Sequence, residues 1–491
     1  MNTLSKTTLS VIDPQIPVEQ IFNLPERVLQ FGTGVLLRGL PAYYIDKANR
    51  AGIFNGRIVV VKSTATGSTD DFAKQDNLYT LHIKGIENGE AVNKSVICSA
   101  ISRVLTAQQQ WADLLDVAAS PDLKLIISNT TEVGIQLVKE DVLSDVPTSF
   151  PGKLLAVLNH RYQTLGGKED TGLIIIPTEL IVDNGKILKD IVIELARYNN
   201  LSDAFIQWLQ TANRFCNSLV DRIVPGKPDA ILQEALTQEQ GYIDHLNIIA
   251  EPYSLWAIEG DAELEEVLSF QLVDEGVIIT PDIELYRELK LRLLNGTHTL
   301  CCAVAILSGF KTVSEAIQND AFAHYITNLV FTEIIPAIPY PISREQAETF
   351  ANKVLDRFRN PYLNHQWQSI AMQYSLKLKA RVVPLLSNYY KIHNAVPLDM
   401  TLGFAAFIRF ANTVKTDDNT YISTINGIDY LLADANADVL HAAWSAGGNT
   451  LTVVERILSN EALWGADLTA VKGFATEVAR NVERVFKAVI Y

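Results

Sequence analysis

Short runs of mostly apolar residues mark the N-terminal half of the chain. The clearest are 27–31, 57–62, 123–128 and 172–177, and their apolar residues are mostly consecutive rather than alternating with polar ones. Runs of this length and composition are typical of strands that are covered on both faces. Helical patterns separate them, which favours a parallel α/β sheet over a β-sandwich or barrel.

The segments between these runs carry apolar residues at helical spacing. The helices predicted there are 35–52, which contains Pro41 and ends at a glycine, 107–120 and 152–166. Beyond about residue 285 the pattern becomes helical, and we predict no strand. The predicted helices of this part are 286–309, 313–335, 343–357, 363–391, 400–415, 428–445, 450–462 and 466–489.

These patterns predict two domains. Residues 1–285 would form the α/β domain, and residues 286–491 an all-helical C-terminal domain. No Pro-rich linker or repeat separates them, so we expect the domains to pack closely, with a ligand site in the cleft between them.

Composition narrows the class of protein. The 491 residues are 48% hydrophobic and carry a formal net charge of −15, and an acidic chain repels nucleic acids and anionic membranes. The opening segment lacks the apolar core of a signal peptide, and the apolar region 293–310 is too short and polar to span a membrane. Four cysteines without CxxC spacing fit reduced thiols. We expect a soluble, cytoplasmic protein that binds neither nucleic acid nor membrane; the oligomeric state cannot be read from the sequence.

A Gly-Thr-Gly turn at residues 32–34 joins the first predicted strand to the first predicted helix. At such a turn the pyrophosphate of a dinucleotide rests on backbone N–H groups. Gly32 would permit the tight turn and Gly34 the close approach of the phosphates, while Leu37 replaces the third glycine and Arg38 would add a positive charge. An ordinary strand–helix turn explains the two glycines equally well.

The second predicted strand ends at Lys62, where NAD-specific sites usually carry an acidic residue. By that rule NADP is possible. The residues alone therefore leave the choice between NAD and NADP open.

The helical pattern at 286–300, which otherwise looks apolar, carries an amine, an amide and an imidazole: Lys290, Asn295 and His298. On an ideal α-helix they fall at about 0°, 140° and 80°, on one side of the helix. Exchanging a hydride with a secondary alcohol also moves the hydroxyl proton, and a lysine can exchange that proton when its pKa falls from ~10.4 to about 7–8. The amide and the imidazole would bond the developing alkoxide. Alternatively, these two brace neighbouring helices and the lysine reaches water.

Motifs of other reaction classes are missing from the sequence. It contains no HExxH, no zinc-type cysteine spacing, no GxSxG and no GxxxxGK[ST]. We therefore expect no metal site, and hydrolase or NTPase chemistry loses its usual support.

The arrangement KxxxxNxxH at 290–298 resembles the signature of the polyol-specific long-chain dehydrogenases, the mannitol dehydrogenase family. Further stretches that carry the resemblance are 31-FGTGVLLR-38, 128-SNTTE-132, 219-LVDRIVP-225 and 357-RFRNPYLNHQ-366, followed by Ser375, Lys377, Arg381 and Pro384. The resemblance covers nearly the whole chain. It implies a Rossmann-type N-terminal domain, a helical C-terminal domain and a metal-independent, NAD-linked reaction. Several stretches look most like members that interconvert D-tagaturonate and D-altronate, so the resemblance implies a small-molecule sugar acid as substrate.

The resemblance also implies roles for individual residues. Lys290 would be the general acid and base, with Asn295 and His298 beside it. The cofactor would contact Leu29, Gln30, Phe31, Gly32, Thr33, Gly34, Val35, Leu36, Leu37, Arg38, Gly39, Leu40, Asn129 and Thr130.

An anionic substrate in an acidic protein needs local cations to receive its carboxylate. The candidates in the matching stretches are Arg222, Lys377 and Arg381, although salt bridges between the domains would explain each of them too. Relatives that act on neutral polyols carry an asparagine where Leu180 stands here. Either Asn184 replaces that residue in substrate binding or Asn295 acts alone.

Two other functions remain open. One is a sister activity on fructuronate and mannonate or on mannitol and fructose. The other is a non-catalytic sensor of a dinucleotide or a sugar acid on a dehydrogenase scaffold.

Overall fold

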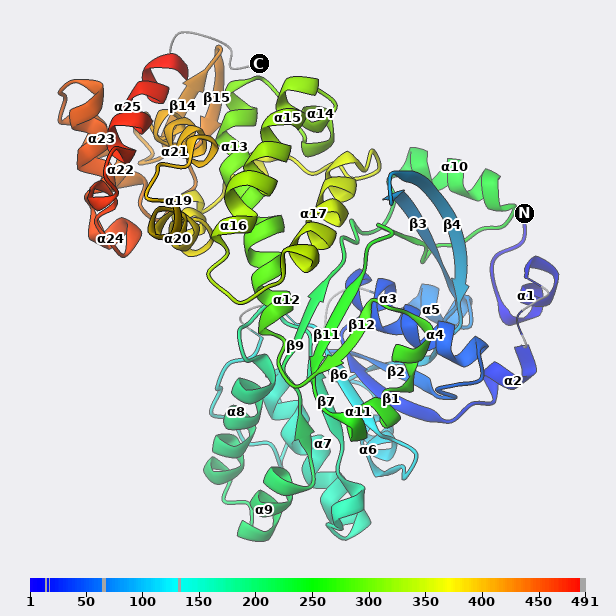
Figure 1. The fold of residues 1–491 in the computed structure, drawn as a ribbon. Helices are drawn as coiled ribbons and strands as arrows, with labels where there is room; N and C mark the ends of the chain where they lie inside the picture. Colours follow the sequence, from blue (N-terminus) through cyan, green and yellow to red (C-terminus); the bar gives the residue numbers. More distant parts are fainter. Residues whose placement is uncertain (14–15, 17, 64–67, 131–133, 486–491) are drawn as a thin grey trace. The chain divides into compact units, whose positions relative to one another are not determined.

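The computed structural model describes every residue except 14–15, 17, 64–67, 131–133 and 486–491. The chain forms two compact units, and Figure 1 shows its helices and strands. Unit 1 comprises Met1–Lys84 and Val92–Ile283, and unit 2 comprises Gly85–Ala91 and Glu284–Tyr491. The segment Gly85–Ala91 comprises the adjoining ends of two consecutive strands and the turn between them. The Gly89 N–H donates to Asp356 Oδ2 at 3.2 Å within unit 2.

A six-stranded parallel sheet lies at the centre of unit 1. Its strands are β1 (Glu26–Phe31), β2 (Arg57–Lys62), β5 (Ile101–Thr106), β6 (Leu125–Ser128), β7 (Ile174–Pro177) and β8 (Arg214–Phe215). They are arranged in the order β5-β2-β1-β6-β7-β8, and all five pairs are parallel. This is the order of a doubly wound dinucleotide-binding sheet, whose switch point lies between β1 and β6. The predicted Rossmann-type fold is confirmed.

Both faces of this sheet are buried, as the apolar runs predict. The neighbouring residues Val28 and Leu29 of β1 belong to opposite cores because side chains alternate across a strand. The core that contains Val28 includes side chains of α3 (Val35–Gly39) and α4 (Pro41–Arg50). The core that contains Leu29 includes side chains of α6 (Trp111–Ala119), α7 (Phe150–Leu165), α8 (Asn184–Tyr198) and α9 (Asp203–Thr211).

The single helix predicted over 35–52 is wrong, because the structure has two helices there. α3 ends at Gly39 and α4 begins at Pro41, and Leu40 between them has φ −133° and ψ −82°. Proline lacks an N–H and would clash inside a helix, whereas its fixed φ suits the first helical turn. Pro41 therefore starts a new helix.

Two smaller sheets complete unit 1, and the apolar pattern did not predict them. One has the order β10-β3-β4 and the other β12-β11-β9. Their strands are β3 (Tyr79–Glu87), β4 (Glu90–Cys98), β9 (Ser218–Asp221), β10 (Ile248–Ala250), β11 (Leu255–Glu259) and β12 (Val277–Thr280). The remaining helices of unit 1 are α1 (Lys6–Ile12), α2 (Val18–Phe22), α5 (Asp70–Lys74), α10 (Ala230–Gln240) and α11 (Ala262–Val267), with 3₁₀ turns at Glu169–Thr171 and Ser269–Val273.

Unit 2 is mostly helical, as predicted, but its long patterns are divided into shorter helices. They are α12 (Glu284–Leu289), α13 (Thr297–Leu307), α14 (Val313–Ile317), α15 (Asp320–Asn328), α16 (Ile335–Ala337), α17 (Arg344–Arg359), α18 (Trp367–Ile370), α19 (Tyr374–Arg381), α20 (Val383–His393), α21 (Leu398–Phe410), α22 (Ala437–Ser445), α23 (Thr450–Leu458), α24 (Glu461–Trp464) and α25 (Phe474–Val485), with a 3₁₀ turn at Leu468–Ala470. Two π-helical segments, Lys290–Gly296 and Leu329–Ile334, connect α12 to α13 and α15 to α16.

The prediction of an all-helical second domain without strands is wrong at one place. β13 (Val414–Lys415), β14 (Tyr421–Ile425) and β15 (Ile428–Leu431) form an antiparallel sheet. Asn426 and Gly427, at φ 51° and 77°, form the two-residue turn between β14 and β15. The predicted helix 428–445 therefore begins only at Ala437. The Asn-Gly pair was the signal that the helical pattern obscured.

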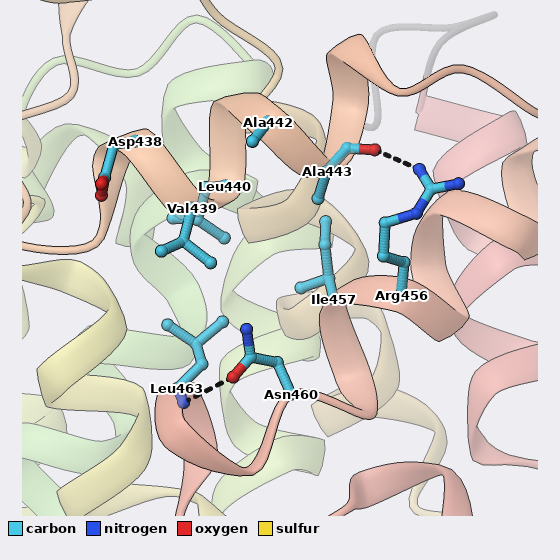
Figure 2. Close-up of a pocket in the computed structure, with 9 residues that line it drawn as sticks. All are labelled: Asp438, Val439, Leu440, Ala442, Ala443, Arg456, Ile457, Asn460 and Leu463. Atoms are coloured by element: carbon cyan, nitrogen blue, oxygen red, sulfur yellow. Dashed lines mark hydrogen bonds between the residues drawn. The ribbon is translucent and has the colours of Figure 1, made fainter.

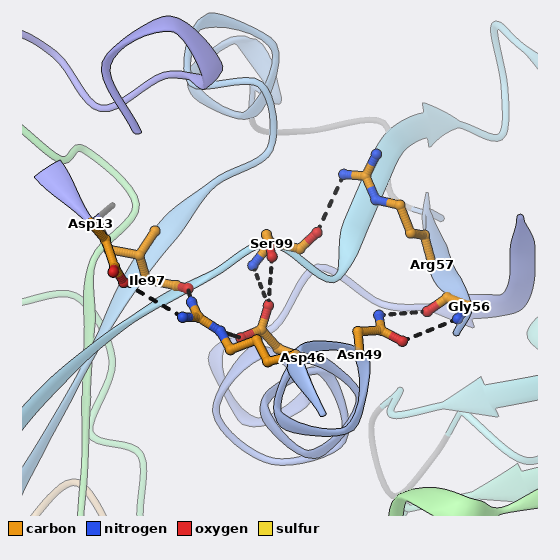
Figure 3. A network of polar contacts seen from close by, with 8 residues as sticks. Asp13, Asp46, Asn49, Gly56, Arg57, Ile97 and Ser99 are labelled. Atoms are coloured by element: carbon orange, nitrogen blue, oxygen red, sulfur yellow. Dashed lines mark hydrogen bonds and ion pairs between the residues drawn. The ribbon is translucent and has the colours of Figure 1, made fainter. Parts of the chain in front are cut away.

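A buried carboxylate ties α4 to the loop between β4 and β5 (Figure 3). Asp46 is 1% exposed and accepts hydrogen bonds from Ser99 N at 2.6 Å and Ser99 Oγ at 2.8 Å. Arg50 Nε donates to the same carboxylate at 2.8 Å, and Arg50 Nη1 reaches Asp13 Oδ2 at 3.5 Å. One turn away, Asn49 exchanges two hydrogen bonds with the Gly56 backbone, at 2.8 and 3.0 Å. These bonds fix α4 against the segments that lead into β2 and β5.

We expect Asp46→Asn to lower the free energy of unfolding by about 2–3 kcal/mol. The ion pair loses its negative partner, and an asparagine that keeps its oxygen toward Ser99 turns its N–H₂ group toward the Arg50 donor. Asp71→Asn is the matched control in the same unit. Asp71 pairs with Lys74 at 3.8 Å, and the two side chains are 47% and 67% exposed. Its loss should change stability by no more than about 0.5 kcal/mol. Denaturant unfolding followed by circular dichroism checks both variants, and equal shifts would contradict the structural role of Asp46.

Candidate functional site

The Gly-Thr-Gly turn lies at the switch point of the unit 1 sheet. Gly32 has φ +126°, and a Cβ there would lie 3.0 Å from both Asn129 O and Leu37 Cδ1. Its N–H donates to Val61 O at 3.0 Å, and its carbonyl accepts from Gln30 Nε2 at 3.0 Å. Gly34 precedes α3 with φ −61°, and open space lies where its Cβ would be. Only glycine fits at Gly32, and a ligand can approach the backbone at Gly34.

Most of the predicted cofactor-binding run 29–40 faces the protein core. Within it, only residues 32–36 are at least partly exposed to solvent. Leu37, in place of the third glycine, packs beneath the turn. The Arg38 guanidinium lies over the rings of Phe72 and Tyr79, at 5.6 and 5.3 Å, and donates to Leu246 O. Burial lowers the pKa of Arg38. These contacts give Arg38 a structural role.

The two other predicted cofactor residues follow β6, directly beside the turn. Asn129 N donates to Phe31 O at 3.1 Å, and Asn129 Nδ2 donates to Thr178 O and Oγ1 at 3.1 and 3.0 Å. Thr130 donates to Glu179 Oε1 through its N–H and its hydroxyl, at 2.8 and 2.9 Å. The structure thus brings Gly32 and Asn129 together at the carboxyl ends of β1 and β6, where an open sheet binds its ligand.

Asn184 and Arg222 also lie in unit 1, and their polar groups bond to the protein itself. The Asn184 amide donates to three backbone oxygens, and its Oδ1 accepts the N–H groups of Gly185 and Ser218, both at 2.9 Å. Arg222 donates to Glu251 O at 3.0 Å and to Gly39 O at 2.7 Å, and it lies over the ring of Tyr43 at 5.0 Å. These contacts support structural roles for Asn184 and Arg222. Leu180 is 61% exposed.

Lys290 and Asn295 lie in a π-helix of unit 2, which changes the α-helical geometry assumed from the sequence. The π-helix spans Lys290–Gly296, and His298 follows in α13. Because a π-helix bonds residue i to residue i+5, side chains five positions apart lie nearly above one another. Lys290 and Asn295 are therefore closer in direction than the α-helical angle predicts. Both are half-buried. π-helical turns are frequent at functional sites.

His298 is a buried imidazole in an aromatic setting. It is 7% exposed, stacks on Phe358 with ring centroids 4.4 Å apart, and meets His365 edge-on at 5.0 Å. Its Nε2 has no hydrogen-bond partner among the described residues. Burial, followed by the positive charges of His365, Arg357, Arg381 and Lys377, holds the pKa of His298 well below its usual range. The ring is therefore neutral at physiological pH and can donate or accept one hydrogen bond.

Three cations lower the pKa of this imidazole, and we call Arg357, Lys377 and Arg381 the cationic cluster. Lys377 Nζ donates to Ile370 O at 2.9 Å, and Arg381 Nη1 donates to Thr299 Oγ1 at 3.2 Å. Burial lowers the pKa of Lys377, with Arg381 adding to the effect, and burial alone lowers that of Arg381. Two of these cations were predicted from the sequence. Arg357 was not assigned a role, although it begins the matching stretch 357–366.

A cavity of about 400 Å³ lies elsewhere in unit 2, between α22, α23 and α24 (Figure 2). Its lining consists of Asp438, Val439, Leu440, Ala442, Ala443, Arg456, Ile457, Asn460 and Leu463. Arg456 donates to Ala443 O, and Asn460 Oδ1 accepts from Leu463 N at 3.1 Å. These two side chains bond helix ends, and none of the predicted site residues lines the cavity.

Among the described residues, no group of three or more His, Cys, Asp or Glu side chains is arranged to hold a metal ion. All four cysteines are free and buried. Within the described part of the chain, no helix combines the length and apolar character needed to cross a membrane.

Models of one family match both units. The mannitol dehydrogenase Rossmann domain matches residues 26–270, and the mannitol dehydrogenase C-terminal domain matches residues 282–486. Three relatives named altronate oxidoreductase are similar over nearly their whole length. The relative from Halalkalibacterium halodurans is 38% identical over 94% of this chain and 91% of its own. Those from Bacillus subtilis and Escherichia coli are 37% and 35% identical, over 93% and 94% of this chain and 92% and 95% of their own.

Two solved structures share the fold. One is Pseudomonas fluorescens mannitol 2-dehydrogenase in a ternary complex with NAD and D-mannitol, at 22% identity and a TM-score of 0.70, covering 99% of this chain and 97% of that chain. The other is a D-sorbitol dehydrogenase in substrate-free form, at 20% identity and a TM-score of 0.77, covering 99% and 98%.

We expect Gly32→Ala to destabilise the turn by at least about 2 kcal/mol, because φ +126° is strained for alanine and its Cβ meets a backbone oxygen. Gly34→Ala should leave the melting temperature unchanged, since its φ is ordinary and its Cβ has space. Calorimetric melting of both variants tests the turn. A Gly32→Ala protein that melts like the wild type would contradict the strain.

Proposed function

We propose a function from the premise that the chain belongs to the mannitol dehydrogenase family, whose two domain models together match residues 26–270 and 282–486. The protein is an oxidoreductase that acts on a CH–OH group. Relatives named altronate oxidoreductase, at 35–38% identity over about 94% of the chain, support the interconversion of D-tagaturonate and D-altronate. The observation that carries the choice of a sugar acid is the cationic cluster near the neutral His298.

The cofactor that we propose is NAD, held by residues 1–285, with the sugar acid held by residues 286–491. The residues of the Gly-Thr-Gly turn fit a dinucleotide: Gly32 is a position that a Cβ would fill, and Gly34 leaves its backbone open to a phosphate. Asn129 would border the same site. When bound, the nicotinamide supplies or takes up the hydride. Lys62 at the end of β2 is the residue that argues for NADP, so the assay must compare both dinucleotides.

Lys290 is the proposed general acid and base for the hydroxyl proton. During reduction its ammonium gives a proton to the oxygen that becomes the alcohol, and during oxidation its amine takes that proton back. Asn295, five residues along the π-helix, would donate a hydrogen bond to the same oxygen. His298, kept neutral by burial and by the cationic cluster, would offer its unpartnered Nε2 to the substrate.

The carboxylate of the sugar acid would bind Lys377 and Arg381. Both are partly buried cations whose pKa is lowered, so an anion beside them would stabilise their charged forms. A guanidinium can bind a carboxylate through two parallel hydrogen bonds, which suits Arg381. Free, buried thiols suit a reducing compartment, and we place the reaction in the cytoplasm.

The substrate assignment is tested by NADH oxidation with D-tagaturonate, D-fructuronate and D-fructose, each repeated with NADPH. We expect the highest kcat/KM with tagaturonate and NADH. A preference for fructose would overturn the sugar-acid assignment, and a preference for fructuronate would move it to the sister activity. Ligand binding without turnover would indicate a sensor.

Lys290→Met should lower kcat by about a thousandfold, since general acid–base catalysis contributes roughly 10²–10⁴ in rate. The Kd for NADH should stay within about twofold of the wild type. Lys311→Met, which replaces an exposed lysine of unit 2, is the control and should keep full activity. Stopped-flow turnover and fluorescence titration separate the two quantities. Undiminished kcat in the Lys290 variant would reject the acid–base role.

A further inference from the structure

Thr299 connects the helical segment that carries Lys290, Asn295 and His298 to the cationic cluster. It follows His298 directly in α13 and is fully buried, at 0% exposure. Its hydroxyl donates to Asn295 O at 2.7 Å and accepts from Arg381 Nη1 at 3.2 Å. A single hydroxyl therefore touches the backbone of a proposed catalytic residue and the side chain of a proposed carboxylate ligand.

The bond to Asn295 lies where the π-helix changes to an α-helix. Lys290–Gly296 ends one residue after Asn295, and α13 begins at Thr297. At such a junction the backbone hydrogen bonds change from the i+5 to the i+4 register, which displaces carbonyls from their ordinary donors. The Thr299 hydroxyl supplies a donor to the Asn295 carbonyl and so holds the peptide that carries the Asn295 side chain.

The backbone carbonyl of Thr299 is hydrogen-bonded as well as its hydroxyl. The Tyr374 hydroxyl donates to Thr299 O at 2.6 Å and accepts from Ala303 N at 2.9 Å, inserted between two groups that an α-helix would pair directly. The insertion links the Thr299 carbonyl to α19, in which Tyr374 lies.

Arg381 is hydrogen-bonded at its backbone and at its guanidinium, by Arg292 of the π-helix and by Thr299 of α13. Arg292, within the π-helix, donates to Ala380 O and Arg381 O at 2.8 and 2.9 Å. The Arg292 guanidinium is in turn paired with Glu288 at 2.9 and 3.1 Å. Arg292 thus sets the backbone of Arg381, and Thr299 sets its guanidinium. Among the described residues, the bond to Thr299 is the only hydrogen bond of that guanidinium.

We propose that Thr299 is a positioning residue that holds the Arg381 guanidinium in place to receive the carboxylate of the substrate. The inference rests on the proposed function, because it needs a sugar-acid anion at Arg381. The competing explanation is that Thr299 only stabilises its own helix, since a threonine hydroxyl often bonds the carbonyl four residues earlier. Thr332 makes that bond, to Asn328 O at 2.7 Å, in the other π-helical segment, and it is exposed.

The test compares Thr299→Val, Thr299→Ser and the control Thr332→Val. Valine keeps the shape and removes the hydroxyl, whereas serine keeps the hydroxyl. We expect Thr299→Val to raise KM for tagaturonate roughly tenfold, the effect of losing one hydrogen bond that orients a charged group. The Kd for NADH should not change. Thr299→Ser should return KM to within about twofold of the wild type, and Thr332→Val should match the wild type.

A double-mutant cycle with Arg381→Gln distinguishes positioning from general support of the helix. If Thr299 acts through Arg381, the combined variant should have no higher KM than Arg381→Gln alone. Additive effects, or a Thr299→Val protein with wild-type KM, would overturn the inference while leaving the proposed function intact. A serine variant as impaired as the valine variant would overturn it too. A wild-type protein that does not turn over any hexuronate would remove the proposed function and the inference together.

Discussion

The change of helical register at Lys290–Gly296 is the constraint on which the site in unit 2 depends. A π-helix spaces its side chains differently from an α-helix, so residues five apart share a direction. Such a segment is less favourable than an α-helix and persists where packing and hydrogen bonds specify it. Here Arg292, Thr299 and Tyr374 supply those bonds. The polar residues that the site needs and the contacts that stabilise their backbone are therefore parts of one network.

Charge is the second organising feature of unit 2. Burying cations costs free energy, and the cationic cluster places several near one imidazole. Lys377 and Arg381 bond a carbonyl and a hydroxyl, which satisfy donors but do not neutralise charge. We propose that the cluster receives an anion, although the chain as a whole carries a net charge of −15. Local charge, not net charge, decides what such a site attracts.

For several polar residues of unit 1, the sequence allows both a structural and a ligand-binding interpretation. Arg38, Arg222 and Asn184 lie in stretches that look functional, and each bonds backbone oxygens inside unit 1. Arg38 lies in α3, Asn184 begins α8 and Arg222 follows β9, and each side chain supplies donors to backbone oxygens of other segments. No local pattern distinguishes an arginine that braces a loop from one that binds a ligand, because the two differ only in which groups the fold brings within reach.

The sequence by itself determined the parallel sheet, the predominance of helices after residue 285, the Gly-Thr-Gly turn and the choice of Lys290, Asn295 and His298 as candidates. Each depends on local spacing, which apolar burial and backbone sterics translate directly into structure. Only the tertiary structure decided the break before Pro41, the sheet at 414–431, the π-helix and the neighbours of His298. Those features arise from packing and hydrogen bonds between residues far apart in the chain, which outweigh local preference and leave no periodic signal.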